Sequence, residues 1–369
     1  MIPSLADIDW HSFLARPPLP SPRSQTLAAL ARQPILITGA GGSIGAALAH
    51  RLAALNPHHL TLLESSESNL YALTAELSPS ASITPILGST ADPALLEHIF
   101  ATHSPAIVFH AAAFKHVPLM EQHSLAAIAN NVFATETLAR AAAAHHARII
   151  LLSTDKAVEP ASVMGATKRV AEQIVLTSDG TALRLGNVLA SRDSVTEIFA
   201  RQIARGGPIT VTDPAARRYF LTLTEAVDLL LTAAAHPHPP ALLAPVLPVP
   251  HFIADLANFM ARALTPQREI AIEFTQPRPG DKEIEQLWSS TETAQPATPN
   301  ASTPGELVSI QSSMLPPSQL ALALAHLHIA VESRDLIAAL AHLQSLVPDY
   351  TPSPSVLALA RQTTHRVSQ

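Results

Sequence analysis

The chain has 369 residues, of which 47% are hydrophobic and 14% charged, a balance typical of a globular protein with a sizeable core. Its net charge is −6 and its basic residues are scattered, so no basic stripe indicates a nucleic-acid partner. Cysteine is absent, which excludes disulfides and thiolate catalysis, and the 18 histidines are too dispersed to predict a metal site.

The first 32 residues are proline-rich and weakly patterned, and we expect them to form an arm that lies on the following domain. They contain no basic patch followed by an apolar segment, so no signal peptide is predicted. No uninterrupted run of about 18 apolar residues predicts a membrane span. A cytoplasmic location is therefore expected.

A strand, a glycine turn and a helix follow in that order. The buried strand Pro34–Thr38 leads into Gly39-Ala-Gly-Gly-Ser-Ile-Gly45, and a run of strong helix formers comes next. In a dinucleotide-binding fold the first of these glycines permits the tight turn, Gly42 lets the backbone approach a pyrophosphate, and Gly45 lets the helix pack on the strand. The phosphate then meets free N–H groups at the helix N-terminus.

A second strand, His59–Glu64, ends in a carboxylate about 20 residues after the last glycine. An acid at this place accepts a hydrogen bond from a ribose 2′-hydroxyl and repels the 2′-phosphate of NADP. Ser65 and Ser66 offer no arginine to hold such a phosphate. The sequence predicts NAD as the cofactor, with NADP as the open alternative.

Apolar strands and helices then alternate. This alternation predicts an α/β fold, a Rossmann-like doubly wound parallel sheet with ligands at the carboxyl ends of the strands. The expected strands are residues 83–88, 106–110 and 148–153, and the expected helices are residues 93–101, 125–145 and a helix that begins near Met164.

Beyond residue 190 the pattern loosens. The expected elements there are helices at 195–204, 224–235 and 252–264, a late strand within 242–249, an exposed Ser/Thr/Pro-rich segment at 289–304, and amphipathic helices near 318–327 and 333–346. The predicted organisation is an N-terminal arm (1–32), a Rossmann domain (33–190), a smaller substrate-binding region that partly returns to the sheet (191–350) and a C-terminal tail (351–369).

Eight motifs occur in a fixed order along the chain. They lie at residues 38–45, 109–118, 153–158, 164–169, 184–189, 207–212, 218–220 and 278–282. Together they resemble the CapD-like polysaccharide-biosynthesis proteins, the nucleotide-sugar dehydratase branch of the extended short-chain dehydrogenase/reductases. The resemblance covers about residues 12–350. Many relatives carry an N-terminal membrane region, and this chain resembles their soluble catalytic part.

The resemblance implies a UDP-N-acetylglucosamine 4,6-dehydratase, a hydro-lyase. In such enzymes bound NAD(P)+ oxidises the sugar C4 hydroxyl, which makes the C5 proton acidic. Water leaves from C5 and C6, the stored hydride returns to C6, and the 6-deoxy sugar enters surface polysaccharide or glycan assembly. The resemblance thus implies a UDP-amino sugar as substrate. A homo-oligomer is also expected, because this fold commonly pairs through its helices.

By the resemblance, Lys156 is the base for the C5 proton and Asp155 the acid for the C6 hydroxyl, with Thr154 hydrogen-bonding near C4. A neutral lysine and a protonated aspartate both require a dry pocket that disfavours charge. Lys168 is expected to hold the nicotinamide ribose. Met164 stands in the place of the family's tyrosine and cannot move a proton. The C4 base is therefore left open between Lys156 and a water-relayed group.

The resemblance also assigns residues around the two ligands. The expected cofactor-binding residues are Thr38, Gly39, Gly42, Ser43, Ile44, Gly45, Glu64, Ala111, Ala112 and Lys168. Planar guanidinium groups suit phosphate oxygens, so arginines figure in the substrate set. The expected substrate-binding residues are Lys115, His116, Asn187, Arg192, Thr210, Arg218 and Arg278.

Some residues depart from the family pattern. Gly88-Ser-Thr90 lacks a carboxylate expected near the adenine, and Ala134, Ala190 and Asp193 stand where glycines are expected. Two alternatives follow. A UDP-sugar 4-epimerase or dehydrogenase would not need an acid–base pair at C5 and C6. A non-catalytic NAD-binding scaffold is motivated by Met164 and the altered glycines.

Overall fold

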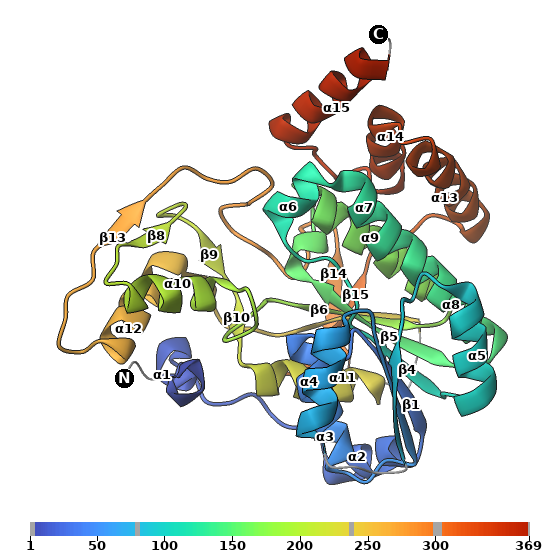
Figure 1. Cartoon of the computed structure of the whole chain (residues 1–369), viewed down its shortest axis with the longest axis horizontal. Helices are drawn as coiled ribbons and strands as arrows, with labels where there is room; N and C mark the ends of the chain where they lie inside the picture. The colour runs from blue at the N-terminus through green and yellow to red at the C-terminus, as the bar shows by residue number, and fades with distance from the viewer. Residues whose placement is uncertain (1–3, 78–81, 236–239, 298–304, 368–369) are drawn as a thin grey trace.

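A nine-stranded sheet forms the centre of the protein, seen here in a computed structural model that describes residues 4–77, 82–235, 240–297 and 305–367 (Figure 1). Its parallel part runs from β3 to β11, and two antiparallel strands close one edge. In sheet order the strands are β3 (Ile83–Leu87), β2 (His59–Glu64), β1 (Pro34–Thr38), β4 (Ile107–His110), β5 (Arg148–Thr154), β6 (Thr181–Leu185), β11 (Ala241–Pro245), β15 (Leu307–Gln311) and β14 (Thr293–Pro296).

This order confirms the predicted doubly wound α/β fold. The sheet grows from β1 in one direction through β2 and β3, and in the other direction from β4 onward. Ligands of such folds bind outside the carboxyl ends of the strands at the point where the order reverses. That point lies between β1 and β4.

Helices cover both faces of the sheet, which is why its strands read as continuous apolar runs. Ile35 and Ile37 of β1 pack in one core and Leu36 between them packs in the other. One face carries α2 (Ser24–Ala31), α3 (Ser43–Ala53), α4 (Glu67–Glu76) and α11 (Leu223–Ala234). The other face carries α5 (Pro93–His103), α6 (Val117–Gln122), α7 (Ser124–Ile128), α8 (Ala134–Ala144) and α9 (Val163–Thr177). An outer layer packs on these helices and consists of α13 (Pro317–Glu332), α14 (Leu336–Leu346) and α15 (Pro354–Val367).

A smaller unit lies beside the sheet, to the left in Figure 1. It has its own core, to which Trp10 and Phe13 of the N-terminal segment contribute. Arg16 of the same segment forms an ion pair of 2.5 Å with Glu225 of α11. The unit contains α1 (Trp10–Leu14), α10 (Val195–Ala204), α12 (Ile253–Leu264), and the strand pairs β7 (Asn187–Val188) with β10 (Phe220–Leu221), β9 (Arg217–Arg218) with β12 (His251–Phe252), and β8 (Ile209–Val211) with β13 (Ile272–Phe274).

The stretch predicted as helical over 125–145 is helical throughout, but its middle is not an α-helix. Between α7 and α8 the chain forms a π-helix, Ala129–Phe133. This wider turn places Asn131 so that it accepts a hydrogen bond from Phe114 N (2.8 Å) and donates to Phe114 O (3.0 Å). π-Helical turns are frequent at functional sites, and this one holds the loop that follows β4.

Most described residues of the segment at 289–304 are exposed, as expected. Two details were not expected there: Ser289 is buried, and Thr293–Pro296 forms the edge strand β14. Residues 298–304 lie outside the described part. Strand β6 was not predicted. The helices expected at 195–204, 318–327 and 333–346 are confirmed as α10, α13 and α14, the last two with extended or shifted ends.

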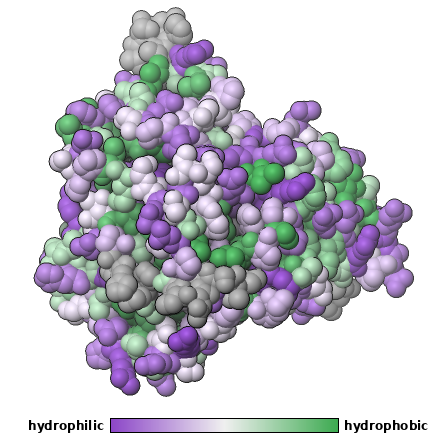
Figure 2. Space-filling view, turned by 180° about the vertical axis from the view of Figure 1, so that it is seen from behind, coloured by the Kyte–Doolittle hydropathy of each residue, from purple (hydrophilic) through white to green (hydrophobic). Residues whose placement is uncertain are grey.

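No helix in the described ranges combines the length and apolar character that crossing a membrane requires. Polar and apolar side chains are intermixed on the face opposite to that of Figure 1 (Figure 2).

Candidate active site

A cavity of about 890 Å³ opens at the carboxyl ends of β1, β4 and β5, between the sheet and the smaller unit. Its wall combines the glycine turn, the loop after β4, the end of β5, α9 and residues 185–199. The predicted site residues that line it are Gly39, Gly42, Ser43, Ile44, Gly45, Ala111, Lys115, His116, Thr154, Lys156, Lys168, Asn187, Arg192, Thr210, Arg218 and Arg278, together with Met164. Thr38, Glu64, Ala112 and Asp155 do not line it.

The glycine turn fits a dinucleotide pyrophosphate. Gly39 has a φ of +65°, and a Cβ there would lie 2.7 Å from the backbone of Ala112. A Cβ on Gly45 would lie 2.1 Å from the carbonyl oxygen of Gly39, so the helix approaches the turn this closely only because residue 45 is glycine. Within the described residues no side chain caps α3 at Gly42. The first N–H groups of the helix are thus left for an anion.

Glu64 lies behind this turn. Its Oε2 accepts a hydrogen bond from Gly41 N and its Oε1 from Ser66 N, both at 2.9 Å. A carboxylate has about four acceptor positions, so these bonds leave capacity for a ribose hydroxyl. The ribose role remains a prediction, and the structure adds a second role, holding the glycine turn against β2.

Thr38 is buried in a hydrogen-bonded row beneath the cavity. Its Oγ1 lies 2.7 Å from His110 Nδ1, and His110 Nε2 lies 2.9 Å from Thr135 Oγ1. Burial, with a smaller contribution from the charge of the nearby Lys168, lowers the pKa of His110 to about 3, so the imidazole is neutral. These hydrogen bonds hold the ends of β1 and β4 in place, and the glycine turn and the loop after β4 start from these ends.

The end of β5 carries Asp155 and Lys156, the residues predicted to act as acid and base. Thr154 Oγ1 and Lys156 Nζ both donate to Asp155 Oδ1 at 2.9 Å, and Lys156 Nζ also donates to Asn187 Oδ1 at 3.0 Å. Asp155 is fully buried, and its Oδ2 has no hydrogen-bond partner among the described residues. The carboxyl group therefore faces the cavity only through its neighbours Thr154 and Lys156.

The expectation that this pocket keeps Lys156 neutral is wrong for the structure as it stands. Burial lowers the pKa of Lys156, but the carboxylates of Asp155 and Glu285 outweigh it, so the net pKa lies above its ordinary value. Asp155 and Lys156 form an ion pair. The contribution of Glu285 to this pKa could not be predicted from the residues around Lys156, because Glu285 comes from a segment about 130 residues further along the chain.

Lys168 lies one helical turn after Met164 on α9, and both line the cavity. Burial lowers the pKa of Lys168 to about 8, although the charge of Glu172 opposes this shift. The Met164 side chain is buried and belongs to the core beneath the site.

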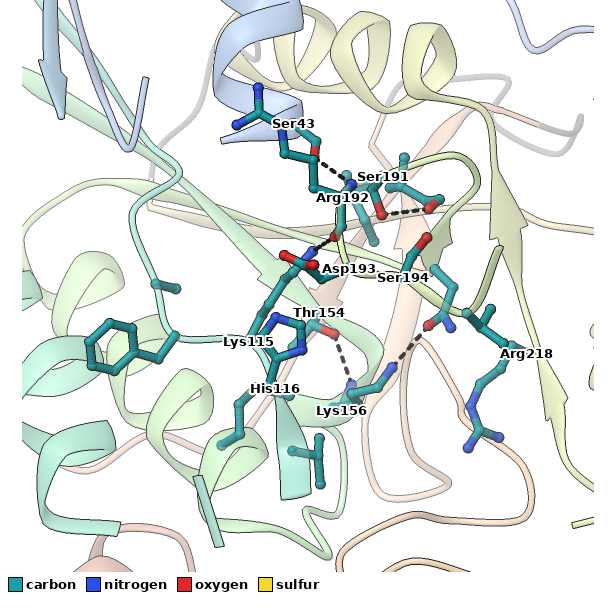
Figure 3. Close-up of a pocket in the computed structure, with 18 of the residues that line it drawn as sticks. Ser43, Lys115, His116, Thr154, Lys156, Ser191, Arg192, Asp193, Ser194 and Arg218 are labelled. Carbon is teal, nitrogen blue, oxygen red and sulfur yellow. Dashed lines mark hydrogen bonds between the residues drawn. The ribbon is translucent and has the colours of Figure 1, made fainter. Parts of the chain in front are cut away.

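The loop at 190–194 closes one side of the cavity (Figure 3). Lys115 Nζ donates to Arg192 O at 2.5 Å, and Arg192 N donates to Ser43 Oγ at 2.9 Å. The Arg192 guanidinium donates to Gly41 O (3.1 Å) and to the side chain of Asn69 (3.0 Å). Arg192 was expected beside the substrate phosphates, but it contacts the glycine turn, where the cofactor is expected.

The remaining predicted substrate-binding residues differ in how many of their hydrogen-bonding groups are already used within the protein. The Arg218 guanidinium donates to the carbonyl oxygens of Arg217, Lys282 and Glu283, so much of its fork is already used. Arg278 is half-exposed and pairs with Asp281. Thr210 accepts a hydrogen bond from Gln202 at 2.7 Å.

One signal in the sequence was missed. Of the 23 lysines and arginines only four are lysines, and all of them line or adjoin this one cavity: Lys115, Lys156, Lys168 and Lys282. Arginine serves wherever a fixed positive charge suffices, whereas lysine can lose its proton when buried. This distribution would have directed attention to Lys282, and three residues beyond it to Glu285.

Two residues of the 190–194 loop stand in the left-handed region, Ala190 with φ +57° and Asp193 with φ +56°. A left-handed residue with a side chain costs about 1–2 kcal/mol. Replacing Ala190 with glycine should therefore stabilise the protein by about 1 kcal/mol, measured as the free energy of unfolding in urea. The matched control is Ala143→Gly on the exposed side of α8, which should destabilise by about 1 kcal/mol. Destabilisation by both changes would contradict the strain at Ala190.

The sheet order, the glycine turn at the start of α3 and the lysine of α9 beneath the same cavity define the chain as an extended short-chain dehydrogenase/reductase. Residues 35–303 match the model of the family described as polysaccharide biosynthesis protein. The chain belongs to this family, in its CapD-like branch.

Its relatives support that placement. The chain is 36% identical over 302 residues to the capsular polysaccharide biosynthesis protein CapD of Staphylococcus aureus, a match that covers 78% of this chain and 50% of CapD. It is 37% identical over 206 residues to a UDP-glucose 4-epimerase of Rickettsia rickettsii, covering 53% of this chain and 59% of that protein. The chain thus spans about half the length of the curated relatives it matches.

Two solved structures are similar as well. Pen from Bacillus thuringiensis has a TM-score of 0.67 at 28% identity, covering 70% of this chain and 85% of its own. DesIV, a dTDP-glucose 4,6-dehydratase of Streptomyces venezuelae solved with NAD and TYD bound, has a TM-score of 0.61 at 18% identity, covering 69% and 87%. At that identity the second likeness shows the fold.

Proposed function

We propose that the chain is an NAD-dependent 4,6-dehydratase of a UDP-amino sugar, with UDP-N-acetylglucosamine as substrate, acting in surface polysaccharide synthesis. The observation that carries this proposal is the arrangement of Thr154, Asp155 and Lys156 at one strand end. Lys156, the proposed base, donates a hydrogen bond to Asp155, the proposed acid, so the two groups lie side by side. Such a pair suits a reaction that removes one proton from a sugar and delivers another proton to the same sugar. Simple oxidation at C4 needs no such pair.

The glycine turn, Glu64 and Lys168 are the residues that would hold NAD. When bound there, NAD supplies the chemistry of accepting a hydride from C4 and giving it back at C6. Arg192 adds a cation that bridges the glycine turn and the loop at 190–194. We assign Lys115, His116 and Arg278 to the UDP-sugar side of the cavity.

The relay from Thr154 to Asp155 supplies a base for the C4 hydroxyl. Thr154 lines the cavity and donates its proton to Asp155 Oδ1 at 2.9 Å, so its oxygen is available to accept a proton from C4. As that proton enters, the threonine proton passes to the carboxylate. Asp155 is then protonated, and Met164 needs no role in proton transfer.

The same proton can serve the elimination. With Asp155 protonated, Lys156 loses its closest counter-charge and burial favours the neutral amine, so Lys156 releases one proton to solvent through the cavity that it lines. Lys156 then takes the C5 proton, and Asp155 returns its proton through Thr154 to the departing C6 oxygen. The C4 hydroxyl proton leaves in water, and the C5 proton returns from Lys156 when C6 is reduced. Lys156 finally regains from solvent the proton that it released before the elimination, so atoms and charges balance over the cycle.

Incubation with UDP-N-acetylglucosamine and NAD+ tests the proposal. We expect a 4-keto-6-deoxy product by NMR, with deuterium at C5 when the reaction runs in deuterated water. UDP-glucose under the same conditions is the control for the amino-sugar preference. Binding of NAD+ without any turnover of either sugar would contradict the dehydratase and favour a non-catalytic scaffold.

A 4-epimerase is the second candidate, because the Rickettsia relative at 37% identity is named a UDP-glucose 4-epimerase. The same incubation distinguishes the two. An epimerase inverts C4, keeps the C6 oxygen and introduces no deuterium at C5. The buried acid–base pair at the end of β5 would then have no task.

A further inference from the structure

We propose that Glu285 is a positioning residue that sets the charge of Lys156, with Lys282 holding it in place. This inference rests on the proposed function, since it gives Glu285 a task only if Lys156 is the base at C5. Neither residue was part of the predicted catalytic set.

Glu285 approaches the catalytic turn from a distant part of the chain. Its side chain is 2% exposed, and its Oε1 lies 4.0 Å from Lys156 Nζ. Its Oε2 forms an ion pair of 2.7 Å with Lys282 Nζ, and Lys282 Nζ donates a hydrogen bond to the carbonyl oxygen of Val158 at 2.8 Å. One lysine thus ties the carboxylate to the turn that carries Lys156.

The backbone around Glu285 is held firmly. Arg217 N donates to Glu283 O at 2.8 Å, and the Arg218 guanidinium donates to Glu283 O (3.0 Å) and Lys282 O (2.8 Å). A buried carboxylate is costly unless it is paired. Its burial between two lysines therefore points to an electrostatic task, because an apolar side chain could fill the same space at lower cost.

The charges that face Lys156 come from three elements. Asp155 lies on its own turn, Glu285 and Lys282 come from the segment beyond residue 281, and Arg218 comes from β9. Burial lowers the pKa of Lys156, Asp155 and Glu285 raise it, and Arg218 lowers it. Once Asp155 has taken a proton, Glu285 is the carboxylate that remains beside Lys156.

Glu285 acts in the elimination step, when Lys156 takes the C5 proton. In the elimination the C5–H bond breaks, its electron pair stays on the sugar, and a new N–H bond forms at Lys156 Nζ. Positive charge therefore develops on Lys156 while Asp155 is still giving up its proton. Glu285, already in place, stabilises that charge.

The test measures the protonation of Lys156 directly. Labelling with [13Cε]lysine should give one NMR signal for each of the four lysines, assigned through single Lys→Arg variants. Glu285→Gln should lower the titration midpoint of Lys156 by about one pH unit or more, a tenfold change in protonation. Glu283→Gln, which removes the same charge from an exposed neighbour, should leave it unchanged. An unchanged midpoint in Glu285→Gln, in a folded protein, overturns the proposal.

A second variant acts with the opposite sign and covers the case in which Glu285→Gln does not fold. Lys282→Met frees Glu285 from its other partner, so the midpoint of Lys156 should rise, and no rise overturns the proposal. In the active enzyme, Glu285→Gln should move the acid limb of the rate of C5 deuterium exchange to lower pH, and Glu285→Asp should restore it. A structural role would lower the rate equally at every pH. The NMR titration needs no turnover, so it stands even if wild-type protein fails to dehydrate the sugar.

Discussion

Replacement of Lys156 by alanine is expected to reduce dehydration by at least about 100-fold, within the range of 10²–10⁴ that a general base contributes. It should also abolish the exchange of the C5 proton with solvent deuterium. The amine lines the cavity and is held by Asp155 Oδ1 and Asn187 Oδ1 at 2.9 and 3.0 Å. No other lysine shares this position. The measurement is NMR of the sugar recovered from deuterated buffer after partial turnover.

The matched control for this prediction is Lys156→Arg. Arginine keeps the positive charge beside Asp155 but does not lose its proton in proteins. If Lys156 acts as a base, both variants should be inactive, whereas a purely electrostatic lysine would leave the arginine variant active. Thermal unfolding of both variants checks that the fold is retained. Undiminished C5 exchange in the alanine variant would remove Lys156 from the base role.

Replacement of Arg184 by methionine is expected to destabilise the protein by about 3–5 kcal/mol, the cost of leaving buried charges without their partner. Arg184 is fully buried on β6. Its guanidinium donates two hydrogen bonds of 2.9 Å to Glu172 of α9, and two of 2.7 and 3.0 Å to Glu292. Ser153, directly before Thr154, donates to Glu172 at 2.6 Å. The network therefore supports the site as well as the fold.

Urea denaturation measures this loss, with Glu76→Gln as the matched control. Glu76 pairs with His50 on the surface, so its change should cost no more than about 1 kcal/mol. Acid unfolding gives a second measurement. Burial raises the pKa of Glu292, but the bonds and charge of Arg184 outweigh it and lower that pKa to about 2. The stability from Glu292 is thus complete above its ordinary pKa of 4.5 and is lost as the pH falls toward about 2. Equal acid unfolding in wild type and Arg184→Met would contradict this account.

Much of the fold could be predicted because it depends on short-range patterns. The strands Pro34–Thr38 and His59–Glu64 are apolar runs bounded by a turn and by a polar helix start. The glycine turn identifies itself because only glycine tolerates the φ of Gly39 and the close packing at Gly45. The π-helix at Ala129–Phe133 could not be predicted in this way. It contains no proline or glycine to mark it, and its Asn131 side chain hydrogen-bonds to Phe114, 17 residues earlier in the chain.

By itself the sequence determined the strand–turn–helix unit, the doubly wound sheet and the position of Thr154, Asp155 and Lys156 at a strand end. These properties follow from backbone preference and burial, which nearby residues control. Only the tertiary structure decided the charge of Lys156, the placement of Arg192 on the glycine turn and the presence of Glu285 4.0 Å from Lys156. A pKa depends on distances between charges, and folding sets those distances by joining segments that lie far apart in the chain.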